Sequence, residues 1–127
     1  MALLSIGEVL EEVFAAAKAL AERGLSVVVF DARFFKPLDT EAILKLADRS
    51  KLVVTAEDAI ADDGFGEHVR LALADGGRKN TVVSLAHKNG LIPNDSIANQ
   101  MKADGLDRDG IVSSCLNALN SLSATNQ

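Results

Sequence analysis

Apolar and polar residues alternate along the chain in two patterns, one typical of strands and the other of helices. Short, dense apolar runs predict four strands, at Ala2–Ile6, Ser26–Phe30, Leu52–Thr55 and Thr81–Leu85. Between and after them, apolar residues recur every three or four positions, which is the spacing of an amphipathic helix. Five helices are therefore expected: Glu8–Arg23, a segment from Asp39 or Thr40 through Ala47, one around Val69–Leu73 ending at Gly76-Gly77, Asp95–Ala103 and Ile111–Leu122.

This order of elements predicts an α/β fold. Strands that alternate with helices form a parallel sheet with helices on both faces, here a three-layer α/β/α arrangement. The unbroken β-branched run Val27–Phe30 suits a strand of such a sheet. Neither a linker nor a repeat interrupts residues 1–122, so we expect one domain there, followed by a frayed polar tail at 123–127.

Composition narrows the classes of function. The 127 residues carry 13 Lys and Arg against 18 Asp and Glu, a net charge of −5. This acidity argues against a nucleic-acid partner, because phosphate binding needs clustered basic residues. No apolar stretch approaches the roughly 20 residues that span a bilayer, so we expect no membrane partner. The single cysteine, Cys115, fits a reducing cytoplasmic location and lies on an apolar helical stripe, where we expect it to be buried.

Acidic residues follow the third expected strand. Glu57-Asp58 and Asp62-Asp63 are placed by the pattern in a loop beyond the carboxyl end of that strand, where open α/β sheets bind ligands. Such carboxylates could hold a hard cation or act as general acid and base. The competing interpretation is a solvated acidic loop in which Asp63 or a neighbour caps the next helix.

Three further groups have both a functional and a structural interpretation. The backbone of Gly64-Phe65-Gly66 could face a phosphate, or the glycines could simply serve a turn. Arg33 and Lys36 are cations at the carboxyl end of the second strand, where they could bind a ligand, or they could form an internal ion pair or an interface contact. His68 and His87 have no metal-ligand spacing, and we expect them to be solvated or hydrogen-bonded.

Residues 31–39, D-A-R-F-F-K-P-L-D, resemble the D-x-R-F-x-K-P-L-D signature in the C-terminal domain of the 1-deoxy-D-xylulose-5-phosphate synthases. These enzymes belong to the transketolase-like, thiamine-diphosphate-dependent family. Shorter pieces resemble the family's segments in the same order: A-L-L-S-I-G at the start, L-V-V-T-A-E-D, the glycine loop, L-I-P, and G-L-D before G-I. The chain departs from the family at Asp62-Asp63, where the family has two glycines.

The resemblance implies a transketolase C-terminal fold with four parallel strands in the order second, first, third, fourth. The family's antiparallel edge strand, which precedes the first strand seen here, is expected to be missing, which would leave an open edge at Val27–Phe30. It also implies a parent enzyme that joins pyruvate to glyceraldehyde 3-phosphate with loss of carbon dioxide, feeding isoprenoid and thiamine biosynthesis. The family holds thiamine diphosphate and Mg²⁺ in its preceding domains, so no cofactor, metal or catalytic residue is assigned to this chain.

The expected role is therefore that of a non-catalytic domain that packs against the cofactor-binding domains and helps to form a homodimer. An apolar face centred on Phe34, Phe35 and Phe65 would serve that purpose. Two alternatives remain open: a part or separate subunit of another transketolase-like or 2-oxo-acid dehydrogenase enzyme, and a regulatory module that binds a small molecule. The candidate interface or ligand cluster consists of Arg33, Lys36, Glu57, Asp58, Gly64 and Gly66.

Overall fold

The computed structural model describes residues 1–33, 37–60, 64–88 and 96–125. They form one sheet of four strands: β1 (Ala2–Ile6), β2 (Val28–Asp31), β3 (Leu52–Ile60) and β4 (Thr81–His87). The strands are parallel and lie in the order β2-β1-β3-β4, which confirms the predicted topology. β1 and β3 therefore occupy the centre of the sheet, and β2 and β4 are its edges.

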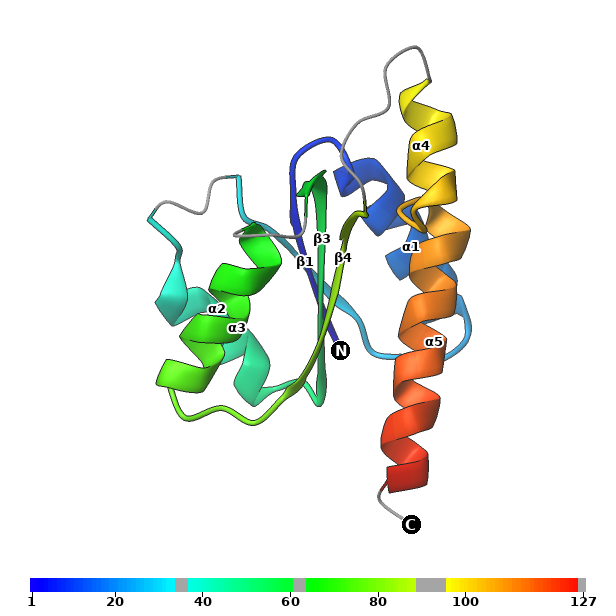
Figure 1. The fold of residues 1–127 in the computed structure, drawn as a ribbon. Helices are drawn as coiled ribbons and strands as arrows, with labels where there is room; N and C mark the ends of the chain where they lie inside the picture. Colours follow the sequence, from blue (N-terminus) through cyan, green and yellow to red (C-terminus); the bar gives the residue numbers. More distant parts are fainter. Residues whose placement is uncertain (34–36, 61–63, 89–95, 126–127) are drawn as a thin grey trace.

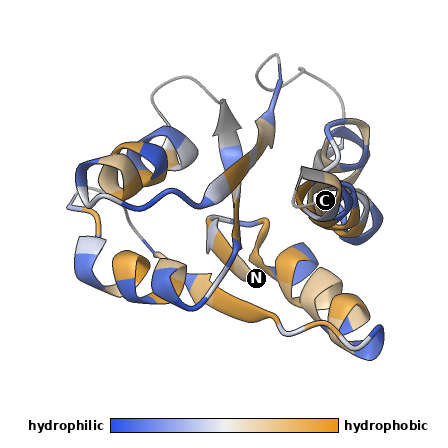
Figure 2. Ribbon diagram, turned by 90° about the horizontal axis from the view of Figure 1, so that it is seen from below, coloured by the Kyte–Doolittle hydropathy of each residue, from blue (hydrophilic) through white to orange (hydrophobic). Residues whose placement is uncertain are grey.

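The described residues also form five helices: α1 (Leu10–Glu22), α2 (Thr40–Asp48), α3 (Phe65–Asp75), α4 (Ile97–Ala103) and α5 (Arg108–Thr125). Figure 1 shows α2 and α3 on one face and α1 and α5 on the other, with α4 above α5. Seen from below, the sheet separates these two helical layers (Figure 2). The predicted three-layer arrangement is thus confirmed. In the described residues, no helix is both long and apolar enough to cross a membrane.

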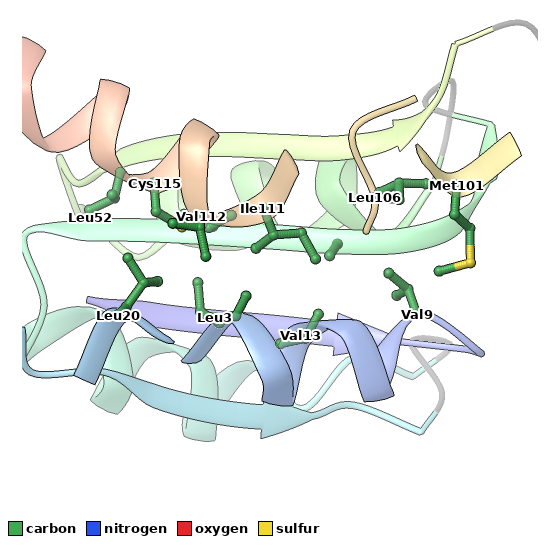
Figure 3. Close-up of a cluster of buried hydrophobic side chains, with 13 residues drawn as sticks. Leu3, Val9, Val13, Leu20, Leu52, Met101, Leu106, Ile111, Val112 and Cys115 are labelled. Carbon is green, nitrogen blue, oxygen red and sulfur yellow. The ribbon is translucent and has the colours of Figure 1, made fainter. Parts of the chain in front are cut away.

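Each face of the sheet has its own apolar core. Figure 3 shows the larger one, which brings together Leu3 of β1, Val13 of α1 and Ile111 of α5. The smaller core lies under α2 and α3 and includes Leu4, Ile43 and Phe65. Alternate residues of β1 therefore enter opposite cores, as the two-residue period of a strand requires.

β3 and the last helix extend well beyond the boundaries expected for them. β3 continues to Ile60 rather than ending at Thr55, so Glu57 and Asp58 lie in a strand and not in a loop. The last helix runs from Arg108 to Thr125, beyond the expected end at Leu122. No Gly or Pro interrupts Ser123–Thr125, so nothing in the sequence stops the helix there.

The edge strand β2 is less buried than its β-branched sequence suggested. Its four residues are exposed or half-buried, and Val28 is 40% exposed. A strand with a neighbour on only one side cannot be covered as completely as a central strand, and among the described residues β2 has only β1 beside it.

Candidate functional site

At one point in the sheet, the connections from two adjacent strands leave in opposite directions. After β1 the chain passes through α1 to β2 at one edge, and after the adjacent β3 it passes through α3 to β4 at the other edge (Figure 1). In open α/β sheets, the carboxyl ends of two such strands form the crevice that ligands occupy. Here the crevice is formed by Gly7 and Glu8 after β1 and by Glu57 and Asp58 in β3.

The carboxylate of Glu57 caps α3. Its side chain is buried, with only 2% of the residue exposed. One oxygen, Oε1, accepts a hydrogen bond from the Phe65 N–H at 3.0 Å, and Oε2 accepts one from the Gly66 N–H at 2.8 Å. Gly64, the residue just before the helix, has no side chain to do this. The cap predicted from Asp63 or a neighbour is therefore supplied by Glu57, and Asp63 itself lies outside the described residues.

The same hydrogen bonds decide between the two interpretations of the glycine loop. The Phe65 and Gly66 N–H groups, which were candidates for phosphate binding, already donate to Glu57. Gly66 has a separate steric role, since a Cβ at this position would lie 2.7 Å from Ser84 Oγ and 2.8 Å from Thr55 Oγ1. Glycine thus allows the first turn of α3 to lie directly on β3 and β4.

Burial controls the electrostatics of Glu57. Desolvation raises the pKa of its carboxyl above the ordinary value, and the nearby carboxylates of Asp58 and Glu67 act in the same direction. The two backbone N–H groups oppose this by stabilising the charged form. A buried carboxylate bound to two N–H groups of a helix N-terminus is a structural anchor.

Asp58 anchors the start of the other helical layer. Its Oδ2 accepts a hydrogen bond from the Glu8 N–H at 2.9 Å. The carboxylate also lies against Gly7, whose φ of +87° is in the region that favours glycine. A Cβ on Gly7 would lie 2.7 Å from Asp58 Cγ, so glycine is required here for two reasons. The two consecutive acids of β3 therefore hold the starts of α1 and α3.

Arg33 lies apart from these acids. It follows β2, and β1 separates β2 from β3. Its backbone has a φ of +55°, its side chain is 83% exposed, and its Nε lies 4.0 Å from Asp31 Oδ2. Arg33 and Asp31 border a cavity of about 470 Å³. The structure thus brings Glu57, Asp58, Gly64 and Gly66 together but leaves Arg33 at a separate place, and Lys36 lies outside the described residues.

Three other expectations can be compared with the structure. Phe65 was expected on an exposed apolar face, but it is fully buried in the core beneath α3, because the cap on its N–H holds it against the sheet. Phe34 and Phe35 lie outside the described residues. His87 is hydrogen-bonded as expected, with its Nδ1 2.7 Å from Asp104 Oδ2. Cys115 is buried in the larger core, also as expected.

Sequence reasoning missed the residue that fixes α5. Glu12 of α1 accepts a hydrogen bond from the Arg108 N–H at 2.6 Å, across 96 positions of sequence. Asp107 provides the local cap by accepting from the Gly110 N–H at 3.0 Å. Only the local cap has a signal in the sequence, the acidic residue just before the helix. The distant one depends on how α1 and α5 pack.

Comparison with known proteins bears on the origin of this arrangement. Residues 1–111 match the family described as transketolase, C-terminal domain. The chain belongs to this family. Membership of the transketolase C-terminal domain family agrees with the observed fold and strand order.

The transketolase C-terminal domain seen here resembles proteins that are much longer. It is 30% identical over 112 residues, 88% of this chain and 18% of the relative, to the 1-deoxy-D-xylulose-5-phosphate synthase of Clostridium tetani (strain Massachusetts / E88). It is 48% identical over 73 residues, 58% of this chain and 11% of the relative, to the enzyme of the same name from Synechococcus sp. (strain JA-2-3B'a(2-13)). The chain thus matches less than a fifth of either relative.

A solved structure shares the fold. The protein named "Split gene transketolase, inactive beta4 tetramer" superposes with a TM-score of 0.85 and 24% identity, covering 94% of this chain and 39% of that one. At this identity the likeness concerns the fold of the transketolase C-terminal domain.

The fold family implies thiamine diphosphate and Mg²⁺, and the donor set of this domain does not suit them. Among the described residues, no group of three or more His, Cys, Asp or Glu side chains is placed to hold a metal ion. At the crevice, the N–H groups that would meet a diphosphate already bind Glu57 and Asp58. A diphosphate there would also meet two carboxylates of its own sign. We therefore assign no step of chemistry through the cofactor to these residues.

Proposed function

We propose that this chain is the non-catalytic C-terminal domain of an enzyme similar to 1-deoxy-D-xylulose-5-phosphate synthase. The parent enzyme would join pyruvate to glyceraldehyde 3-phosphate with loss of carbon dioxide. Thiamine diphosphate and Mg²⁺ would be held by the preceding domains. This domain would pack against them and take part in dimer assembly.

The observation that carries the proposal is the use of Glu57 and Asp58. Acids at the carboxyl edge of a parallel sheet are the first candidates for catalysis, and here both serve backbone N–H groups at the starts of α1 and α3. Decarboxylation of a keto acid requires an electron sink, which a cofactor supplies. A domain whose crevice is filled by its own carboxylates is suited to be a scaffold for neighbours that carry that cofactor.

The surface proposed for packing is the side of the domain around β2. Val28 is partly exposed there, and the guanidinium of Arg33 extends into solvent beyond the end of the strand. An exposed strand edge beside a cation offers both backbone hydrogen bonds and an ion-pair partner to an adjacent domain. Phe34 and Phe35 follow directly in the sequence and remain part of the proposed face.

Isothermal titration calorimetry tests whether this domain binds the cofactor by itself. Thiamine diphosphate with Mg²⁺ is titrated into the purified chain, and the complete Clostridium tetani enzyme is titrated in parallel as the positive control. The proposal expects binding heat from the complete enzyme and none from the chain. Micromolar binding to the chain alone would refute it.

The same titration with phosphorylated metabolites tests the regulatory-module alternative, which requires binding at millimolar ligand or below.

A second candidate is a separate subunit of a split transketolase-like enzyme. The observation that favours it is the structural neighbour, which is itself described as a split gene transketolase. The reading frame upstream of Met1 separates the two candidates. A continuous frame that encodes the cofactor-binding domains supports the first, and a separate frame whose product copurifies with the tagged chain supports the second.

A further inference from the structure

The edge strand β4 has the properties of a strand that can pair with another chain. In the described residues no strand lies beyond it. It is seven residues long, against four for β2, and Thr81–Ala86 contains neither a charged residue nor a proline. Charges, prolines and short length are the usual means by which edge strands avoid pairing. None of these features is present in the segment Thr81–Ala86.

Arg70 of α3 provides the open edge of β4 with a charged residue. The Arg70 guanidinium donates a hydrogen bond from Nη2 to the backbone carbonyl of Val82 at 2.9 Å, in an exposed position. Paired strands lie only about 4.8 Å apart, so a carbonyl between β3 and β4 is shielded from a solvated side chain. We infer that this carbonyl is on the outer side of β4. Arg70 therefore occupies an acceptor of the open edge and places a cation beside it.

We propose that the outer edge of β4 is a strand-pairing surface that Arg70 keeps closed, and that the partner it fits is the same edge of a second copy. An antiparallel pair of β4 strands centred on Ser84 would place Val83 opposite Leu85 of the other copy, and Val82 opposite Ala86. Cross-strand pairs of apolar residues stabilise such a ladder, and no like charges oppose one another within it. Symmetric contacts of this kind generate a closed dimer with a twofold axis.

The test compares the unmodified chain with Arg70→Ala. Alanine is the strongest helix former, so the substitution is compatible with α3. Sedimentation velocity over a concentration series should show a dimer dissociation constant at least about tenfold lower in the variant. Hydrogen exchange then locates the contact: the amides of β4 should exchange more slowly in the dimer, while those of β2 stay unchanged.

Two control variants test whether the loss of another exposed charge has the same effect as the loss of the Arg70–Val82 hydrogen bond. Lys79→Ala removes an exposed cation two residues before β4, and Glu67→Ala alters an exposed charge in the same helix as Arg70. Neither should change the dissociation constant by more than about twofold. Arg70→Gln provides a second variant at the decisive position and should dimerise as Arg70→Ala does.

The proposal is overturned if folded Arg70→Ala or Arg70→Gln is no more dimeric than the unmodified chain. It is also overturned if the dimer protects β2 rather than β4, or if Lys79→Ala dimerises equally well. These outcomes leave the family assignment and the proposed function untouched, since neither depends on the β4 edge.

Discussion

Gly7 and Asp58 form a steric and hydrogen-bonded unit at the point where the connections after β1 and β3 leave toward opposite edges of the sheet. The Asp58 carboxylate fills the space where a side chain on Gly7 would begin, and from there it accepts the Glu8 N–H at 2.9 Å. The start of α1 therefore depends on two residues. Gly7, after β1, leaves the space open because it has no side chain, and Asp58 of the neighbouring strand β3 fills that space with its carboxylate.

Gly7→Ala is expected to cost more stability than Gly24→Ala. Both glycines have a similar positive φ, +87° and +84°, but a Cβ on Gly24 meets nothing within 4 Å. The shared backbone strain costs about 1–2 kcal/mol. In Gly7→Ala the displaced Asp58 loses its bond to the Glu8 N–H, which adds about 1.5–3 kcal/mol for a charged acceptor. Urea unfolding measures the two free energies of unfolding.

An Asp58→Ala background provides the control for this prediction. With the carboxylate removed, Gly7→Ala should cost no more than Gly24→Ala, because only the strain of the backbone remains. If the excess cost persists in that background, the contact with Asp58 is not its source.

Glu57→Ala should destabilise the chain by about 2–4 kcal/mol, because it removes the buried carboxylate that accepts from the N–H groups of Phe65 and Gly66. The matched control is Asp39→Ala, which removes the local cap that accepts from the Ala42 N–H at 3.2 Å. That cap is exposed, and its loss should cost about 1 kcal/mol. Equal losses in the two variants would mean that the burial of the Glu57 cap adds nothing.

Glu57→Gln and Asp48→Asn should change the pH dependence of the free energy of unfolding in opposite directions, relative to the unmodified chain. The folded-state pKa of Glu57 is raised, so its contribution to stability decreases as pH rises above about 4.3, its usual unfolded value. The hydrogen bond from Arg78 lowers the pKa of Asp48, so its contribution is present above about 3.9 and is lost as pH falls.

Urea unfolding between pH 3 and pH 7 checks these signs. Relative to the unmodified chain, Glu57→Gln should gain stability with rising pH, and Asp48→Asn should lose it. A Glu57→Gln curve parallel to that of the unmodified chain would show that burial does not govern the ionisation of Glu57.

The strand order and the helical layers were predictable because they follow from local pattern and from family resemblance. Ala2–Ile6 and Thr81–Leu85 are apolar runs of strand length, and the helices between them have the matching spacing. The cap of α3 was not predictable from local rules, which look for an acceptor at the residue before a helix. Here that residue is Gly64, and the acceptor comes from Glu57, eight residues before Phe65 and in another element.

The prediction that Phe65 lies on an exposed apolar face was wrong for a related reason. A phenylalanine between two glycines is typical of a surface loop, and Phe65 would remain there if nothing held its backbone. Glu57 fixes that backbone against β3, and Gly66 allows the close approach, so the ring enters the core. The position of Phe65 thus follows from two residues that the sequence pattern assigned to other roles.

Arg33→Gly should leave the isolated chain as stable as before or stabilise it by up to about 1 kcal/mol. The φ of +55° is costly for arginine and free of strain for glycine. The lost ion pair with Asp31 is exposed and 4.0 Å long, so it contributes little. Arg49→Gly, at a helix end with a φ of −98°, offers no relief of strain and should destabilise. A marked loss of thermal stability in Arg33→Gly alone would contradict this account.

Cys115 should react with iodoacetamide far more slowly in the folded chain than in urea. The residue is fully buried, and desolvation raises the pKa of its thiol to about 11. Since only the thiolate attacks, both the small thiolate fraction and the lack of access slow the reaction near pH 8. We expect a difference of at least about a hundredfold, because an ordinary thiol with a pKa of about 8.5 is already partly ionised there. The control is the double variant Ser113→Cys, Cys115→Ala, which moves the thiol to an exposed position on the same helix. Its thiol should react at nearly the rate of the unfolded chain. Fast modification of native Cys115 would mean that α5 does not stay packed against α1.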